Sequence, residues 1–463
     1  MDLTIIPAPK TISGDGHRMP VRPVIQSDVP FDRCVNAFCS YAKKAYGIDF
    51  ASGAGGILLR QDASVPKSGY RLECDEKGVF LYASDSDGAA YGLSTLLQLL
   101  REDCSVPCVC ISDYPDCEYR SLMVDLARQW HPFETLFRYV DICWLYKIKY
   151  LHLHFEDYQS YTLCSDVFPK LPTPGRSYTK EQIKQLSDYA FSRNVELIPE
   201  IEFPGHGTQK KLTYPELFGN TPVSPDAKID DSLLCVGKHG VMDSIRKLLE
   251  EVISLFPHSR YLHVGGDEAL LDGWNYCADC LAYMERNRIP DVHTLYTHFT
   301  KEITDLVLEL GKIPIVWEGF PKEGTEDLSR QVLVMGWESY YHLPNELVEE
   351  GFSVVNASWQ PLYITPDRYW QVEDILNWNV YNWQNWNKKT AAYHQPIQLA
   401  PTVQVKGALL GAWEWDHEGE FPLVKRNLAA LSERIWNIES YVNQEAFLKR
   451  LSAVLSLADR ILH

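Results

Sequence analysis

The sequence predicts an α/β fold: a (β/α)₈ TIM barrel preceded by a small α+β domain. With 463 residues, the chain is too long for one ordinary core, and a barrel needs roughly 250 residues or more. From Arg120 onward, short apolar runs alternate with segments of helical periodicity. These runs number eight, whereas a doubly wound sheet, the alternative, usually has fewer parallel strands. We therefore expect an N-terminal α+β domain over residues 1–115 and the barrel over residues 116–463.

The first domain opens with an extended segment at Ile6-Pro-Ala-Pro9. Helical periodicity predicts helices over Phe31–Ala45 and Ala89–Leu100. Alternating apolar residues predict short strands over 56–59, 70–72 and 78–82. No residue pattern in this part indicates catalysis.

The barrel elements follow in order along the rest of the chain. The expected strands are Ser121–Ala127, Tyr150–Phe155, Val195–Ile201, Tyr261–Val264, Ile313–Trp317, Val332–Trp337, Phe352–Asn356 and Ala408–Trp413. The expected helices are Phe133–Tyr146, Lys180–Arg193, Met242–Phe256, Thr294–Leu310, Asn345–Glu350 and Phe421–Trp436.

Most of these strands end in polar or aromatic side chains that core packing alone does not explain. The active site of a TIM barrel lies at the carboxyl ends of its strands. The residues there are Asp125, Arg128, His154, Asp157, Glu200, Glu202, Asp267, Glu268, Trp317, Glu318, Trp337, Glu338, Trp413 and Glu414. Arg120 is an exception near a strand start. To bind a ligand it must reach inward or belong to a displaced first strand.

The most informative segment is Tyr261-Leu-His-Val-Gly-Gly-Asp267-Glu268. Two glycines end an apolar run and are followed by adjacent carboxylates. Because neighbouring carboxylates repel, the site must keep one ionised and push the other towards protonation. Such a pair suits acid/base cleavage of an acetal. The alternative is ordinary capping of a helix that begins at Glu268.

Composition excludes several functions. The chain is 45% apolar, with a mean hydropathy of −0.23. A net charge of −18 argues against a nucleic-acid or anionic-membrane partner. No signal peptide or membrane span is visible in the sequence, and twelve cysteines without an export signal suggest reduced thiols in a cytoplasmic protein. The 13 Trp and 26 Tyr residues include flat apolar faces that suit sugar rings.

Cys277-Ala-Asp-Cys280 is a CxxC motif and resembles half of a zinc site. A second pair is needed, and the nearest cysteines are distant and irregularly spaced: Cys104, Cys108, Cys110 and Cys117. Two packed thiols are the favoured interpretation, so the prediction includes no metal and no cofactor.

Four motifs together resemble family-20 glycoside hydrolases, the β-N-acetylhexosaminidases, over nearly the whole chain. They are Tyr-Arg120-Ser-Leu-Met-Val-Asp125-Leu-Ala-Arg128, Leu-His152-Leu-His154-Phe-Glu-Asp157-Tyr-Gln159, Ile-Pro-Glu200-Ile-Glu-Phe-Pro204-Gly-His206 and His263-Val-Gly-Gly-Asp267-Glu268. Ser432-Glu-Arg-Ile-Trp436 resembles the segment that closes the family's barrel.

The resemblance implies a role for each acid. Glu268 would protonate the glycosidic oxygen and later activate water. Asp267 would not attack the sugar but would orient the substrate's own 2-acetamido group, whose carbonyl oxygen attacks C1 to form an oxazolinium ion. Family 20 is classified as substrate-assisted on these grounds.

The resemblance also implies binding residues. Tyr363 would bond the acetamido oxygen, Arg120 would hold sugar hydroxyls, and Asp157 with His206 would tune Glu268. Trp317, Trp337 and Trp413 would wall the acetamido pocket. Each has a structural alternative: His206 in a turn, one of His152 and His154 buried in the core, the indoles as core packing, and Tyr363 as an ordinary loop tyrosine.

The sequence departs from the family pattern around the sugar's O4 and O6. Thr365 and Trp415 stand where members commonly have Asp and Glu, Glu202 replaces an Asp, and Tyr158 replaces a second Asp. Glu414, Asp416 or the Asn377–Trp386 loop would have to compensate.

The predicted function is an exo-acting, retaining β-N-acetylhexosaminidase that binds small glycosides ending in β-linked N-acetylhexosamine. One alternative is a family variant that is GalNAc-selective, takes a 6-substituted sugar or releases disaccharides. The others are a non-catalytic sugar-binding barrel and, more remotely, a metal-dependent hydrolase using His152 and His154. The sequence does not predict the oligomeric state.

Overall fold

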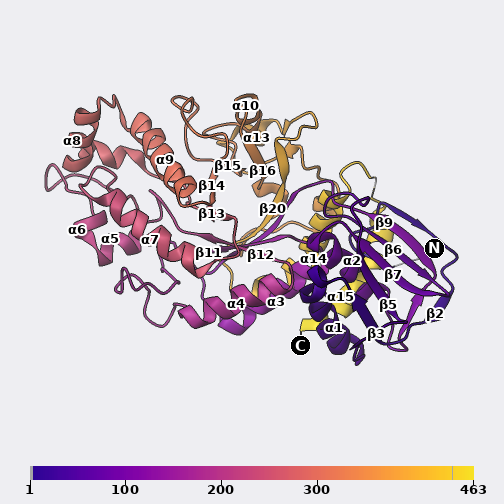
Figure 1. The fold of residues 1–463 in the computed structure, drawn as a ribbon. Coiled ribbons are helices and arrows are strands. Elements are labelled where there is room, and N and C mark those ends of the chain that lie inside the picture. The colour runs from indigo at the N-terminus through magenta and orange to yellow at the C-terminus, as the bar shows by residue number, and fades with distance from the viewer. Residues whose placement is uncertain (1–3, 441, 463) are drawn as a thin grey trace.

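A computed structural model describes residues 4–440 and 442–462 and contains a mixed N-terminal sheet beside a parallel barrel (Figure 1). The strand order of the first sheet is β1-β9-β6-β7-β5-β3-β4. In that order the strands are Thr11–Ser13, Val109–Asp113, Tyr70–Asp75, Gly78–Ala83, Ile57–Gln61, Val24–Ser27 and Ala51–Ser52. A separate pair joins β2 (Arg18–Pro20) to β8 (Ser105–Pro107).

Helix α1 (Asp32–Tyr46) follows a short 3₁₀ turn η1 (Val29–Phe31), and α2 (Ser86–Leu99) packs on β6 and β7. Asp85 caps α2 by accepting a hydrogen bond from the Gly88 amide. Twelve of the fourteen residues of α2 are buried. In Figure 1, α1, α2 and the C-terminal helix α15 (Gln444–Leu462) lie between this sheet and the barrel.

The predicted barrel is confirmed. Its parallel strands β10 to β16 follow one another around the barrel, and β20 closes it by pairing with both β16 and β10. The strands are β10 (Tyr119–Asp125), β11 (Tyr150–His154), β12 (Glu196–Glu200), β13 (Tyr261–His263), β14 (Ile313–Trp317), β15 (Leu333–Gly336), β16 (Ser353–Asn356) and β20 (Val405–Ala412). A short strand β17 (Tyr363–Ile364) pairs with the carboxyl end of β20, at Gly411 and Ala412.

The expected helices are also present, with ends that differ by up to four residues. They are α3 (Phe133–Leu145), α4 (Lys180–Ser192), α7 (Val241–Leu255), α9 (Val292–Glu309), α10 (Pro344–Glu349) and α14 (His417–Trp436). Helix α14 begins before the predicted Phe421 because Asp416 caps it through the amides of Glu418 and Gly419. None of the helices in the described residues is long and apolar enough to cross a membrane.

Short elements in the strand-to-helix connections make up the rest of the barrel face. They are α5 (Thr208–Thr213), α6 (Pro215–Phe218), η2 (Leu271–Tyr276), α8 (Ala278–Asn287), α11 (Trp359–Leu362), α12 (Val372–Leu376), β18 (Asn382–Trp383), α13 (Ala391–His394) and β19 (Ile397–Gln398).

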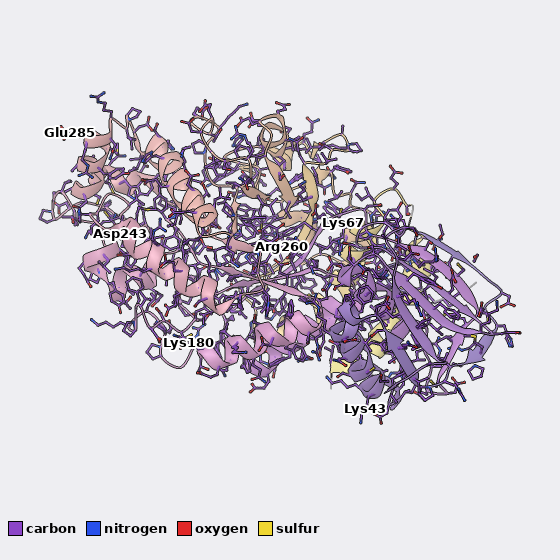
Figure 2. The ribbon with its side chains drawn as sticks, in the orientation of Figure 1. Lys43, Lys67, Lys180, Asp243, Arg260 and Glu285 are labelled. Carbon is purple, nitrogen blue, oxygen red and sulfur yellow. The ribbon has the colours of Figure 1, made fainter. Side chains whose placement is uncertain are left out.

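Helices of both domains carry charged side chains at the surface of the molecule. Figure 2 places Lys43 of α1, Lys180 of α4 and Glu285 of α8 at the edge of the molecule. Thr179 and Gln182 form a capping box at the start of α4, which fixes where this helix leaves its loop.

A buried polar cluster joins the first domain to the amino-terminal end of the barrel. Lys147 Nζ donates to Asp113 Oδ2 and Tyr70 Oη at 3.0 Å, and Trp436 Nε1 donates to Asp113 Oδ1 at 2.8 Å. Because Lys147 is fully buried, the carboxylate of Asp113 is needed to hold its charge. The N-terminal domain is therefore fixed against the barrel by charged and polar contacts as well as by the packing of α1 on α4 and of α2 on α3.

Candidate active site

The strand register brings four polar side chains to one level of the barrel. Asp125 pairs with His154, His154 pairs with Glu200, and Glu200 pairs with His263. All four are buried. Because parallel strands of a barrel end at the same rim, the residues after them converge on one site.

Glu200 is the centre of this level. Its Oε2 lies 2.7 Å from His154 Nδ1 and 3.0 Å from His152 Nε2, and its Oε1 lies 3.1 Å from His263 Nδ1. The Trp317 indole also donates to Oε1, at 2.5 Å. Burial opposes ionisation, but the surrounding imidazoles outweigh it and hold the pKa of Glu200 well below its usual range.

Asp157 links this centre to the outer part of the site. Its Oδ2 lies 3.0 Å from His154 Nε2 and 2.7 Å from Arg128 Nη2, and its Oδ1 lies 3.1 Å from His206 Nδ1. Burial opposes ionisation here too, but hydrogen bonds from the two histidines lower the pKa of Asp157. Burial lowers the pKa of His154, but Glu200 and Asp157 raise it to about 10, so His154 is cationic.

His206 connects Asp157 to the adjacent carboxylates. Its Nε2 lies 3.7 Å from Asp267 Oδ2 and 3.6 Å from Glu268 Oε2. Burial lowers the pKa of His206, but Asp267 and Asp157 together raise it above its usual value. The structure therefore brings together the four residues that the sequence predicts to form the acid/base centre.

The two adjacent carboxylates occupy different environments. The side chain of Asp267 is 14% exposed, whereas that of Glu268 is 50% exposed. Asp267 Oδ1 is buried without a hydrogen-bond partner among the described residues. Burial, with Glu268 adding to it and His206 opposing it, raises the pKa of Asp267 to about 6. Asp267 is thus mostly ionised at neutral pH and has a free acceptor oxygen.

The backbone after β13 explains the two glycines. A Cβ at Gly265 would lie 2.0 Å from Glu202 Oε2, and Gly266 has a φ of +111°. The hydroxyl of Tyr296 donates to the Gly266 carbonyl and holds this turn in place. Glu268 itself has a φ of +48°, a strained conformation of the kind that clusters at functional sites.

This geometry corrects the helix-capping alternative. The next helical element is η2, which starts at Leu271, and no side-chain hydrogen bond caps it. Asp267 and Glu268 are therefore not an N-cap.

Glu202, which replaces an Asp of the family pattern, lies buried beneath the pair. Burial, with Asp267 and Glu200 adding to it, raises its pKa well above the usual range. This shift favours the protonated form of Glu202, which adds no negative charge beneath Asp267.

The predicted aromatic residues form one cage. The ring centroids of Trp317 and Trp413 are 5.8 Å apart, and those of Tyr363 and Trp413 are also 5.8 Å apart. Trp359, which was not predicted as a site residue, lies between Tyr363 and Trp337. Its ring centroid is 5.7 Å from that of Tyr363 and 5.9 Å from that of Trp337. These side chains belong to the second of two buried apolar clusters, which also contains Met123, Ile198 and Leu409 of the barrel strands.

Arg120 is a correction. It is 2% exposed, and its guanidinium donates to the carbonyls of Lys147 and Cys117 and to the Tyr91 hydroxyl. It lies near the start of β10 and helps to join the N-terminal domain to the barrel. Its donors are thus used at the end of the barrel opposite the site.

Arg128 lies where the sequence interpretation placed Arg120. Its guanidinium bonds Asp125 and Asp157 at 3.0 and 2.7 Å and lies 5.1 Å from the Trp413 ring. The side chain is 16% exposed, so it reaches the site surface. The sequence already indicated this role for Arg128, because Arg128 follows the predicted strand Ser121–Ala127 whereas Arg120 precedes it.

Two further glutamates shape the rim. Glu318 is buried and accepts hydrogen bonds from the amides of Ser339, Tyr340 and Tyr341, which fixes the loop after β15. Burial, with Glu318 and Glu268 adding to it, raises the pKa of Glu338 to about 7. Glu338 is therefore a third carboxyl close to the catalytic candidates.

Thr365 and Trp415, on the side of the site expected to face O4 and O6 of the sugar, do not supply carboxylates in place of the Asp and Glu of the family pattern. The Thr365 hydroxyl donates to Arg368 O at 2.8 Å, and Trp415 packs over Gly419 at the start of α14. Asp416 is occupied as the cap of α14, so it is removed from the compensating candidates. Glu414 is exposed, and its charge acts on Arg128, so it stays a candidate.

The Asn377–Trp386 loop contributes mainly structure. Asn385 Nδ2 donates to Glu338 O and Trp383 Nε1 donates to Gly336 O, both at 3.0 Å. Trp386 packs against Trp359 with ring centroids 4.9 Å apart, which places it beside the cage.

Side chains of the kinds that bind metal ions also lie close together in this site. His152, Glu200 and His263 offer atoms within 4.8 Å of one another, as do His206, Asp267 and Glu268. Glu200 supplies the third ligand type that the sequence interpretation lacked for His152. However, the Glu200 oxygens already form hydrogen bonds with the His154 imidazole and the Trp317 indole, so the arrangement resembles a hydrogen-bond network more than an open metal site.

Comparison with known proteins agrees with this geometry. Residues 117–439 match the model of the glycosyl hydrolase family 20 catalytic domain, and residues 2–114 match that of family 20 domain 2. A beta-hexosaminidase of Porphyromonas gingivalis is 31% identical over 309 residues, which is 61% of this chain and 39% of that protein. One of Akkermansia muciniphila is 32% identical over 287 residues, 56% of this chain and 58% of that protein. This chain thus spans less than two-thirds of either relative.

The fold comparison covers nearly the whole chain. The crystal structure of the GH20 exo beta-N-acetylglucosaminidase of Vibrio harveyi in complex with N-acetylglucosamine superposes with a TM-score of 0.85. The match covers 99% of this chain and 78% of that chain at 22% identity, so it supports the fold. On the family-model matches, the chain belongs to glycosyl hydrolase family 20.

Proposed function

We propose that this chain is an exo-acting β-N-acetylhexosaminidase that removes terminal β-linked GlcNAc or GalNAc with retention of configuration. The observation that carries the proposal is the free, buried Oδ1 of Asp267, next to the half-exposed Glu268. An anionic acceptor with no internal partner costs stability unless a ligand donor satisfies it. The names of the relatives from P. gingivalis and A. muciniphila support the same activity.

In the first step the substrate supplies the nucleophile. The acetamido group enters the cage of Trp317, Trp337 and Trp413, and its N–H donates to Asp267. Its carbonyl oxygen forms a bond to C1 while the glycosidic C1–O bond breaks. The leaving oxygen keeps the bonding electrons and takes the proton of Glu268. Asp267 stabilises the positive charge that builds on the oxazolinium ring.

In the second step Glu268 acts as a base. It removes a proton from water, whose oxygen attacks C1 and opens the oxazolinium ring. Both displacements occur at C1, so the product keeps the β configuration. The exposure of Glu268 suits this role, because the leaving group must depart and water must enter.

The cage has a second function in this proposal. It excludes water from the acetamido group and holds the carbonyl oxygen within reach of C1, which lowers the entropic part of the barrier. Tyr363, which is 5% exposed, would donate its hydroxyl proton to that oxygen. Burial and the nearby Asp267 raise the Tyr363 pKa well above its usual value, so the hydroxyl remains a donor.

His206 and Asp157 are positioning residues. The chain of contacts from Glu200 through His154, Asp157 and His206 ends between the two carboxylates. A cationic His206 would favour the anion of Glu268 when water has to be activated.

Arg128 is the proposed contact to the sugar hydroxyls. Its guanidinium is fixed by Asp125 and Asp157 and has one face over Trp413. Glu414 is the candidate acceptor beside it.

A family-20 enzyme with altered specificity is the second candidate function, because Thr365 and Trp415 replace carboxylates of the family pattern. A non-catalytic sugar-binding barrel is disfavoured, because a simple binder gains nothing from a buried Asp267 whose pKa is raised. None of the twelve cysteines forms a disulfide, which supports a reducing compartment such as the cytoplasm.

The proposal is tested by turnover of matched chromogenic β-GlcNAc, β-GalNAc and β-glucose glycosides. The two amino sugars should be hydrolysed, and the β-glucoside should be inert because it lacks the nucleophile. Proton NMR at early times should show the β-anomer as the first product. Comparable hydrolysis of the β-glucoside, or a sugar ester trapped on Asp267, would overturn the proposal.

A further inference from the structure

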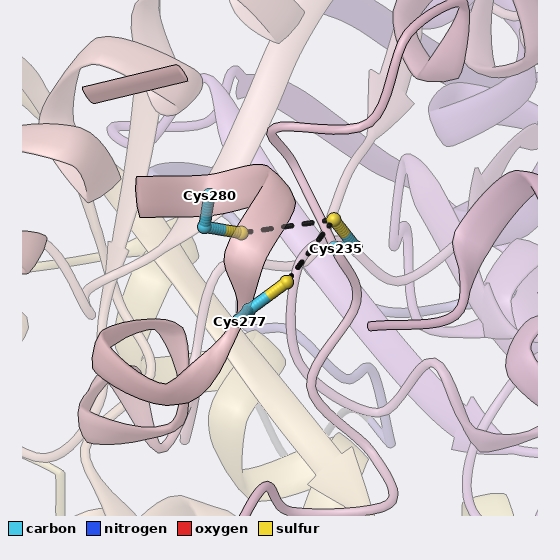
Figure 3. Close-up of side chains that lie close together, drawn as sticks. All are labelled: Cys235, Cys277 and Cys280. Atoms are coloured by element: carbon cyan, nitrogen blue, oxygen red, sulfur yellow. Dashed lines mark hydrogen bonds between the residues drawn. The ribbon is translucent and has the colours of Figure 1, made fainter. Parts of the chain in front are cut away.

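Three buried thiols meet beside the active site, from two different loops. Cys235 lies in the connection between α6 and α7, Cys277 directly precedes α8, and Cys280 lies in the first turn of α8 (Figure 3). All three have no exposed surface. Cys235 is the third thiol that the CxxC motif lacked in the sequence interpretation, and it comes from 42 residues before Cys277.

The sulfur spacing fits a tetrahedral metal site. Cys235 Sγ lies 3.6 Å from Cys277 Sγ and 3.7 Å from Cys280 Sγ, and the three sulfurs lie within 4.8 Å of one another. With a Zn–S bond of about 2.3 Å, the edge between two sulfurs of a tetrahedron is about 3.8 Å. A disulfide needs about 2.05 Å and would leave the third thiol unpaired.

The neighbouring segment 218–222 offers an oxygen. Cys235 N donates to Phe218 O, and Ala278 N donates to Thr221 O, so this segment runs along both sides of the cluster. Between these two contacts, Asn220 has both polar side-chain atoms buried with no hydrogen-bond partner among the described residues. Buried amides without a partner are costly, so a missing ligand is a physical explanation.

We propose that Cys235, Cys277 and Cys280 bind one Zn²⁺ as thiolates, with an oxygen as the fourth ligand. Borderline-soft Zn²⁺ suits three sulfurs, and a CxxC at a helix start with a third cysteine from another loop is a common zinc arrangement. This site is separate from the carboxylates of the proposed reaction, and its test needs no substrate.

The metal would fix the loop of the proposed acid against the loop of His206. Cys235 follows Leu234, whose amide donates to Pro204 O at 2.9 Å and whose carbonyl accepts from Trp274 Nε1 at 2.8 Å. Trp274 lies in η2, between Glu268 and Cys277. A metal that links Cys235 to Cys277 therefore holds the connection that contains His206 against the connection that contains Glu268.

Zinc content is the first test. The full chain is purified under a reductant, without immobilised metal, and zinc is measured by plasma mass spectrometry. We expect about one zinc per chain that survives dialysis. Cys277→Ala and Cys235→Ala should lose it, whereas the control Cys143→Ala, at a buried thiol in α3, should keep it. Zinc-edge X-ray absorption should give three sulfurs at about 2.3 Å and one oxygen.

The wild-type protein provides a test that does not depend on variants folding. Chelation followed by Co²⁺ should give a thiolate-to-cobalt charge-transfer band, and returning Zn²⁺ should remove it. Removal of zinc should also lower the melting temperature. Purified protein without zinc and without a cobalt band, with either all thiols free or a mass two hydrogens lower from a disulfide, would overturn the proposal.

Discussion

Replacing Asp267 with asparagine should make the free protein more stable at neutral pH while largely removing its activity. The carboxylate is 14% exposed and has an oxygen without a partner. Burial raises the pKa from 3.8 to about 6, so the folded protein carries a charge that its surroundings disfavour. Asparagine is similar in shape and removes that charge.

The size of the effect follows from the pKa. The folded state binds the proton more tightly than the unfolded state, so the wild type loses stability as the pH rises from about 4 to about 6. A rise of the Asp267 pKa from 3.8 to about 6 corresponds to a loss of stability of about 3 kcal/mol at pH 7.5 and about 1 kcal/mol at pH 4.5. The new amide also needs a partner, so about 3 kcal/mol is the upper bound on the gain.

The assay is guanidinium unfolding of wild type and Asp267→Asn at both pH values, with Asp272→Asn as an exposed control in the same connection. The variant should unfold at a higher midpoint at pH 7.5, and the difference should shrink at pH 4.5. Its kcat should fall by roughly 10²–10³, because the interaction with the acetamido N–H strengthens in the transition state. A variant that is less stable at pH 7.5, or a difference independent of pH, would refute the reasoning.

Three further substitutions and one comparison of substrates test the site. Glu268→Gln should lower turnover of natural glycosides by roughly 10²–10⁴, with less effect on substrates that have acidic leaving groups; near-normal activity would rule Glu268 out as the acid. Arg128→Ala should lower kcat/KM by roughly tenfold to a hundredfold. By contrast, Arg120→Ala should leave KM unchanged but lower the free energy of unfolding by roughly 2–4 kcal/mol; an altered KM would contradict the reassignment. Because Thr365 and Trp415 offer no carboxylate, kcat/KM for GlcNAc should exceed that for GalNAc by less than about a hundredfold, and a larger ratio would mean that another group such as Glu414 has replaced the missing acids.

The barrel was predictable because its strands are buried, short and regularly separated by amphipathic helices. The ends of elements were less predictable. Strand β20 starts at Val405, before the predicted Ala408, because Gly407 continues the strand with a φ of +143° against the Tyr119 carbonyl. The pattern of apolar residues does not predict such a close approach of two backbones, so the start of this strand was placed too late.

The candidate site was predictable where residues follow a strand end, as do Asp267, Glu268 and the cage tryptophans. The prediction for Arg120 was wrong because the match to the family motif was given more weight than the position of Arg120 at the start of a strand. Trp359 was missed as a site residue because its role depends on contacts across loops. Cys235 could not be joined to Cys277 and Cys280, because only the fold brings these loops together.

The claim that the substrate's acetamido group is the nucleophile is tested most directly by fluorinating that group. In a series of β-GlcNAc glycosides with N-acetyl, N-monofluoroacetyl, N-difluoroacetyl and N-trifluoroacetyl groups, each fluorine withdraws electrons from the attacking carbonyl oxygen and changes the sugar little elsewhere. The account predicts a steep fall in kcat/KM with every fluorine, in parallel for the wild type and for variants outside the site. A flat series would contradict it, because the rate would then not depend on the nucleophilicity of the acetamido oxygen.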